Sequence, residues 1–117
     1  MKAIAAGVFR SAAQIIENQG NTPVSPCEVD PDGSVRLCAA AALAVAGVRL
    51  YAGQKSVGLL LEKLVAQPDR NLIRATFARF RWSTEDCDMK MQLNDSLSPA
   101  IRRTRIVSLF NNLASAM

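Results

Sequence analysis

The most informative absence in this 117-residue sequence is histidine, which does not occur once. Histidine is the side chain whose unperturbed pKa lies nearest neutrality, and nucleophilic serine and cysteine most often pass their proton to it. Its absence excludes the Ser–His–Asp triad, the Cys–His dyad and every zinc site that uses imidazole. The composition therefore argues against most hydrolases and favours a protein without enzymatic activity.

Cysteine is also scarce, with three residues, Cys27, Cys38 and Cys87, and no close pair among them. A secreted disulfide framework normally has an even number of cysteines, and structural zinc takes about four Cys or His ligands. Three cysteines could hold zinc only if Asp or Glu completed the site. We therefore expect reduced thiols, a cytoplasmic location and no cofactor.

Long hydrophobic runs are missing as well. The apolar run over residues 37–48 is bracketed by Arg36 and Arg49, and it is shorter than the ~18–20 residues that a membrane-spanning helix needs. Near the N-terminus, Arg10 interrupts the apolar segment that follows Lys2. The apolar residues there recur at helical spacing, which favours a helix over a signal peptide. We expect no membrane partner.

Aromatic residues make up only 5% of the chain, whereas hydrophobic residues make up 50%. The core must therefore consist mostly of alanine and aliphatic side chains, which is typical of closely packed helices because sheets prefer β-branched and aromatic residues. The length suits one domain, residues 1–117. The sequence predicts a mainly α fold, a compact orthogonal bundle of four or five helices that can also include one short strand or hairpin.

Apolar spacing and capping residues predict where the helices lie. The segment "CAAAALAVAG", residues 38–47, is apolar all round, so its helix should be enclosed by the others at the centre. Within it, Gly47 is expected at a close crossing, while Gly20 should end the first helix in the left-handed conformation and Gly53 should stop the second. Helices are predicted over residues 2–18, over 38–50, from a Ser56 cap to Pro68, over 70–81 behind an Asp69 cap, and from Ser98 and Pro99 onward.

Two stretches read as irregular. Residues 21–34 contain three prolines and a "DPDG" turn, and a short extended piece can follow at residues 35–37. Residues 82–94 begin as an acidic loop, after which Met89, Met91 and Leu93 alternate with polar residues like one short strand. Such a strand would pair with residues 35–37 or with another subunit.

The net charge is +4, and ten of the fourteen basic residues are arginine. One group lies within ~40° on the predicted fourth helix at 100° per residue: Arg70, Arg74 and Arg81. A second group opens the last helix: Arg102, Arg103 and Arg105. These groups support nucleic-acid binding as an alternative function, although the turn lacks a glycine and polar base-reading residues are sparse on that face. The simpler interpretation is solvation or pairing with the carboxylates Asp69, Glu85 and Asp86.

Cys38 stands at the start of the predicted helix over residues 38–50. Unpaired amide groups and the helix dipole at that position would lower the pKa of its thiol. A buried cysteine, by contrast, is usually an inert apolar residue. Cys38 is therefore predicted to be either a core residue or the reactive group of a protein that binds a small ligand or uses a thiol.

The order of several short motifs resembles a family of small bacterial proteins of unknown function. The motifs are "AAQIIENQG", "DPDG", Cys38 followed by small apolar residues, and "LND" before a basic final helix. The resemblance implies no activity, but it singles out Cys38, Asn94 and Asp95 as positions of interest. Asn94 and Asp95 are also natural turn formers and caps immediately before a helix.

The leading functional prediction is a non-enzymatic interaction protein whose partner is another protein, either a second copy or a partner subunit. It rests on the missing catalytic groups and on apolar residues spread over several helices. Nucleic-acid binding through the two arginine groups is the first alternative, and a ligand-binding or thiol-dependent role for Cys38 is the second.

Overall fold

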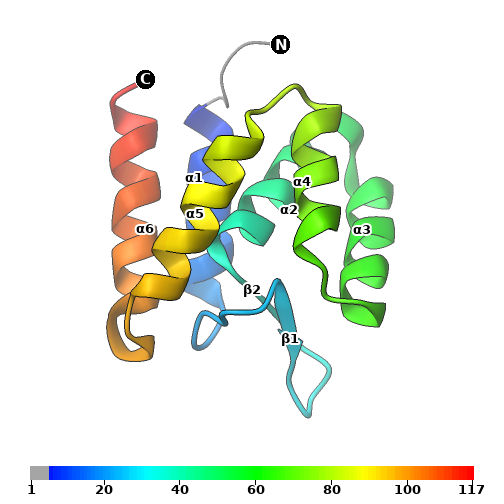
Figure 1. The fold of residues 1–117 in the computed structure, drawn as a ribbon, viewed down its shortest axis with the longest axis horizontal. Helices are drawn as coiled ribbons and strands as arrows, with labels where there is room; N and C mark the ends of the chain where they lie inside the picture. The colour runs from blue at the N-terminus through cyan, green and yellow to red at the C-terminus, as the bar shows by residue number, and fades with distance from the viewer. Residues whose placement is uncertain (1–5) are drawn as a thin grey trace.

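The computed structural model describes residues 6–117, which contain six helices and one two-stranded antiparallel sheet (Figure 1). The predicted mainly α class is confirmed, with one helix more than the four or five expected. The predicted start of the first helix at Lys2 lies outside the described residues. The elements are α1 (Ala6–Asn18), β1 (Cys27–Val29), β2 (Val35–Leu37), α2 (Ala39–Ala52), α3 (Gln54–Ala66), α4 (Arg70–Arg79), α5 (Thr84–Ser96) and α6 (Pro99–Ser115).

Helix α2 is the centre of the fold, as its sequence predicts. Figure 1 shows it between the α1–α6 pair on one side and α3 and α4 on the other, with α5 crossing in front. Every residue from Ala39 to Val48 is buried, because a helix without a polar face is stable only when other elements surround it. No helix within residues 6–117 is both long enough and apolar enough to cross a membrane.

Gly47 in α2 lies at a close contact, but with the side chain of Trp82 in the turn between α4 and α5 and not at the predicted crossing of two helices. A Cβ atom at this position would lie 1.9 Å from Cη2 of Trp82. The Trp82 side chain is buried and packs edge-on against Phe77, with 5.0 Å between the ring centroids. The indole ring therefore fills the space that the missing side chain of Gly47 leaves free.

The two strands form a hairpin around the predicted turn. Cys27 pairs with Leu37 and Val29 with Val35, and the Asp30 amide donates to the Ser34 carbonyl at 2.8 Å. The expectation that residues 35–37 pair with residues near 89–93 or with another subunit is therefore wrong. The partner of this strand lies only a few residues upstream.

The largest correction concerns residues 82–94, which form most of helix α5 and not a loop and a strand. Ser83 caps the helix by accepting a hydrogen bond from the Asp86 amide. The residues that point inward are Cys87, Met91 and Asn94, at spacings i, i+4 and i+7. The apparent two-residue alternation was misleading because Met89 lies on the exposed face of the helix.

Three boundaries also differ from expectation. Gly20 does not adopt the left-handed backbone conformation that was predicted for the end of the first helix. Gly53 has φ of +89° and joins α2 directly to α3. Helix α3 therefore begins before Ser56, which lies inside the helix and does not cap it. Helix α4 ends at Arg79, and Arg81 lies in the following turn with φ of +60°.

Candidate functional site

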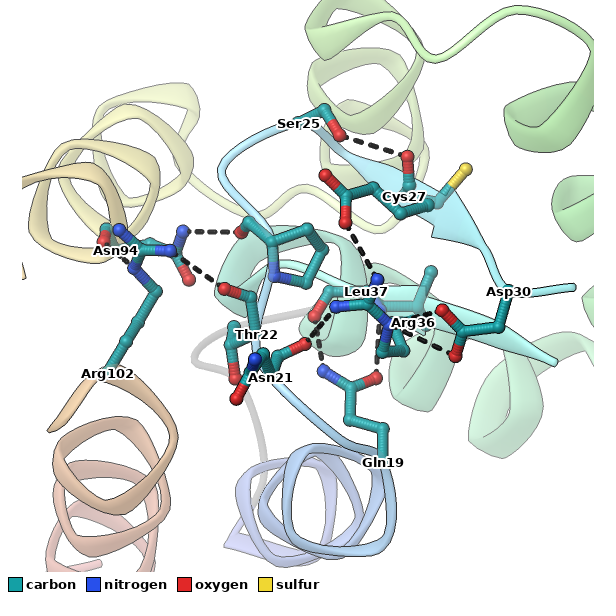
Figure 2. A network of polar contacts seen from close by, with 12 residues as sticks. Gln19, Asn21, Thr22, Ser25, Cys27, Asp30, Arg36, Leu37, Asn94 and Arg102 are labelled. Atoms are coloured by element: carbon teal, nitrogen blue, oxygen red, sulfur yellow. Dashed lines mark hydrogen bonds and ion pairs between the residues drawn. The ribbon is translucent and has the colours of Figure 1, made fainter. Parts of the chain in front are cut away.

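Asn94 is fully buried and holds three parts of the chain together. Its Oδ1 accepts a hydrogen bond from the amide of Ala39 at 3.1 Å, and its Nδ2 donates to the carbonyl of Pro23 at 2.9 Å (Figure 2). The expectation that Asn94 is a cap just before the last helix is wrong, because it lies within α5 and caps the N-terminus of α2. Its role in the described contacts is to fasten α5 to α2 and to the loop before β1.

Asp95 lies in the last turn of α5 and forms an ion pair with Arg70 of α4. Its other carboxylate oxygen, Oδ1, is buried and has no hydrogen-bond partner within the described residues. Like Asn94, Asp95 belongs to α5 and does not form a turn before α6. The ion pair joins the end of α5 to the start of α4.

Cys38 is buried at the N-cap of α2, where its Sγ accepts a hydrogen bond from the Ala41 amide at 3.4 Å. Its predicted position at the start of this helix is confirmed. Burial raises the pKa of the thiol to about 11, against the opposing effect of the Ala41 and Ala40 amides. The helix terminus therefore does not activate this cysteine, because the loss of hydration outweighs the amide hydrogen bonds.

The other two thiols, of Cys27 and Cys87, also have pKa values raised by burial. Burial raises the pKa of Cys87 to about 12 and also raises that of Cys27, whose Sγ donates to the Leu64 carbonyl. All three cysteines are free and buried. Across residues 6–117, no three Cys, Asp or Glu side chains gather where they could hold a metal ion.

The raised pKa values of these three thiols predict that the protein loses stability at alkaline pH. Their folded-state pKa values are raised above the ordinary value of 9.0, so the unfolded chain releases protons that the folded chain retains. The resulting stability is fully present below pH 9 and is lost as the pH rises toward 11, by at most ~1.4 kcal/mol per thiol and pH unit. Urea unfolding at pH 8, 9 and 10 measures the slope.

The variant Cys38→Ser should show a shallower decline over the same pH range, since it removes one of the three thiols. In the native protein, a disulfide reagent such as dithionitrobenzoate should label the cysteines slowly, and in urea it should label all three at once. Rapid labelling of Cys38 in the folded state would contradict the inert thiol and restore the thiol-dependent alternative.

The first group of arginines does not form the stripe that its spacing predicts. Arg70 pairs with Asp95, and Arg74 pairs with Asp88 of α5, its Nε lying 2.6 Å from Oδ1. Arg81 lies beyond the end of α4. Neither pair uses the carboxylates expected from sequence: Asp69 caps α4, and Glu85 and Asp86 stand in the first turn of α5.

In the second group, Arg102 is buried and is used internally. It donates from Nε to the Asn94 carbonyl at 2.7 Å and from Nη1 to the Thr22 carbonyl at 2.8 Å (Figure 2). Its Nη2 donates to the Leu97 carbonyl at 2.7 Å. Sequence reasoning missed this role. The signal was present, because Arg102 precedes the buried Ile106 and Phe110 at i+4 and i+8 on the same face of α6.

The two remaining members of this group lie on the surface of α6. Arg103 donates to the Glu17 carbonyl at 2.6 Å, and Arg105 is exposed. The predicted set of six arginines is therefore divided among ion pairs, a buried carbonyl cluster, a turn and the surface.

A groove with a mixed apolar and polar lining lies between α3 and α4. Both helices pack against α2, and they make few contacts with each other. The groove has a volume of about 340 Å³. The floor comes from Val48 of α2, and each wall is one helical stripe with spacing i, i+3, i+4 and i+7: Ser56, Leu59, Leu60 and Lys63 on α3, and Leu72, Ala75, Thr76 and Arg79 on α4.

The groove continues past Lys63 and Leu72 into a second hollow of about 500 Å³ near the turn that joins the helices. From Ser56 to Gln67 the wall of α3 is about 16 Å long, or three helical turns. Leu59 is 51% exposed on its rim. Val65, in contrast, is 41% exposed on another face of α3.

The charged residues in the groove are mostly basic. Lys63 and Arg79 make no ion pair within residues 6–117, and the Arg79 guanidinium lies 5.7 Å from the centre of the Phe80 ring. Asp69, at the far end of the second hollow, accepts a hydrogen bond from the Asn71 amide as the cap of α4. The site thus combines aliphatic side chains with two cations that have no carboxylate partner within residues 6–117.

No family model matches the chain, and no curated protein or solved structure matches it. The resemblance to small bacterial proteins of unknown function therefore stays a prediction. Any functional proposal must rest on the geometry and chemistry of the described residues.

Proposed function

We propose that this protein is a non-enzymatic interaction module of the cytosol that binds an amphipathic helix of a partner protein in the groove between α3 and α4. The observation that carries this proposal is the separation of these two helices above Val48, which leaves a groove with Leu59 exposed on its rim. A cytosolic location agrees with three free cysteines.

The shape of the groove favours a helix as its occupant. Both walls present residues at i, i+3, i+4 and i+7, so each wall forms a ridge of side chains against which a third helix can pack. The length of about three turns matches the anchors that such a helix places at i, i+3 or i+4, and i+7. Burial of the exposed part of Leu59 would supply part of the affinity.

The two alternatives receive less support. Arg70, Arg74 and Arg102 are occupied by carboxylates or carbonyls, and a nucleic-acid site needs cations that are free to meet phosphates. Catalysis by Cys38 is disfavoured by its burial and by the raised pKa of its thiol.

The proposal can be tested with a synthetic helical peptide of about 15 residues that has leucines on one face and glutamine elsewhere. We expect the peptide to bind and to shift the amide resonances of α3 and α4 selectively. Leu59→Gln should weaken binding about tenfold, because it removes the apolar area that the peptide would cover. Fluorescence anisotropy of a labelled peptide gives the dissociation constants.

Val65→Gln is the matched control, since it makes the same kind of change at a similarly exposed position of α3. At 100° per residue, Val65 lies about 120° around the helix from Leu59, so its replacement should leave binding unchanged. Equal weakening by both variants, or no binding by the peptide, would contradict the proposal. Light scattering that shows a dimer converted to a monomer by Leu59→Gln would instead assign the groove to a second copy.

A further inference from the structure

We propose that the helix bound between α3 and α4 is acidic, with carboxylates on both flanks of its apolar stripe that meet Lys63 on one wall and Arg79 on the other. This inference rests on the proposed function, because it names the chemistry of the partner for the same groove.

The two cations lie at different places along the groove. Lys63 also borders the second hollow near the α3–α4 turn, whereas Arg79 does not. Because the chain reverses direction between α3 and α4 (Figure 1), Arg79 lies toward the opposite end of the groove and on the opposite wall. The two cations therefore border the groove on opposite walls and toward opposite ends.

The two cations of the groove also lack ion-pair partners within residues 6–117. Within residues 6–117, the arginines with carboxylate partners are Arg36, Arg70 and Arg74, whereas exposed cations such as Arg49 and Arg105 have none. Cations beside an apolar surface gain most from a partner whose carboxylates reach them when the apolar faces exclude water.

The separation of Lys63 and Arg79 along the groove sets the spacing of the carboxylates that a partner helix would need. Leu72 borders both hollows together with Lys63, and Arg79 is seven residues beyond Leu72, which corresponds to about 10 Å along the groove. Two residues that are six positions apart on a helix rise about 9 Å and lie about 120° apart around it. A partner with acidic residues six positions apart, one on each side of its leucine stripe, therefore fits both cations.

The experiment compares three synthetic peptides that share one leucine stripe and differ only in this flanking pair, which is glutamate, glutamine or lysine. At low salt, the glutamate peptide should bind about tenfold more tightly than the lysine peptide, with the glutamine peptide between them, and about 0.5 M salt should reduce the difference. The double variant Lys63→Glu/Arg79→Glu should reverse the order of the three dissociation constants.

The matched control is Arg10→Glu/Arg105→Glu, which lowers the net charge by the same four units at exposed positions of α1 and α6. It should keep the original order. If it abolishes the preference as fully as the groove variant does, net charge and not the groove selects the peptide, and the inference is overturned.

The other outcomes separate this inference from the proposed function. Equal binding of all three peptides would leave the groove as a helix-binding site and overturn its acidic preference. Binding of none would overturn both. A dimer that the glutamate peptide cannot dissociate, and that Leu59→Gln can, would assign the groove to a second copy and also overturn the inference.

Discussion

The variant Asn94→Ala is expected to lose about 4 kcal/mol of unfolding free energy, a large share of the stability of a domain this small. The substitution removes both hydrogen bonds of a fully buried side chain. The Ala39 amide and the Pro23 carbonyl would then be left without partners, and each buried, unsatisfied group costs about 1–3 kcal/mol. Urea unfolding followed by far-ultraviolet circular dichroism measures the loss.

Gln92→Ala provides the control on the same helix, because Gln92 is exposed and its replacement should change stability by less than about 0.5 kcal/mol. Asn94→Asp separates the two hydrogen bonds. It keeps the acceptor for Ala39 but places an oxygen opposite the Pro23 carbonyl, so it should also be destabilised at neutral pH. If Asn94→Ala is no less stable than Gln92→Ala, the link between α5 and α2 does not contribute as described.

The variant Gly47→Ala is expected to lose about 3 kcal/mol, an unusually large effect for the addition of one methyl group. The new Cβ would lie 1.9 Å from the Trp82 ring, which is itself held against Phe77, Phe80 and Tyr51. The ring cannot move aside without disturbing these contacts. Trp82 is the only tryptophan in the chain, so its fluorescence should shift to longer wavelength if the variant exposes it.

Gly58→Ala is the matched control, with the same substitution in the interior of helix α3. A Cβ at Gly58 would meet nothing within 4 Å, and alanine favours the helix by about 0.5–1 kcal/mol over glycine. The two variants should therefore change stability in opposite directions. A neutral or stabilising Gly47→Ala would mean that Trp82 does not pack over this glycine.

Several features of this protein followed from local sequence signals. The apolar character of α2 on all sides required a central helix. The "DPDG" segment forms the hairpin turn, Asp69 caps α4, and Pro99 begins α6. Each of these depends on a few neighbouring residues whose backbone preferences or polarity act over short distances.

Helix α5 shows where local signals were insufficient. The spacing of Met89, Met91 and Leu93 fits a two-residue period, and few of the residues of this helix are strongly apolar. The helical period prevails because it buries Cys87, Met91 and Asn94 on one face and lets Asn94 reach groups 55 and 71 residues away. Because these contacts are made with residues far away in the chain, the sequence of residues 82–94 alone does not reveal that the segment is helical.

The candidate sites depended on tertiary structure for the same reason. Arg102 reaches a carbonyl 80 residues away, which turns a residue predicted to meet phosphate into part of the core. The groove exists because α3 and α4 pack separately on α2. The sequence by itself determined that α2 is the central helix, and only the tertiary structure decided how far apart α3 and α4 lie on it, because that distance depends on how three helices pack together.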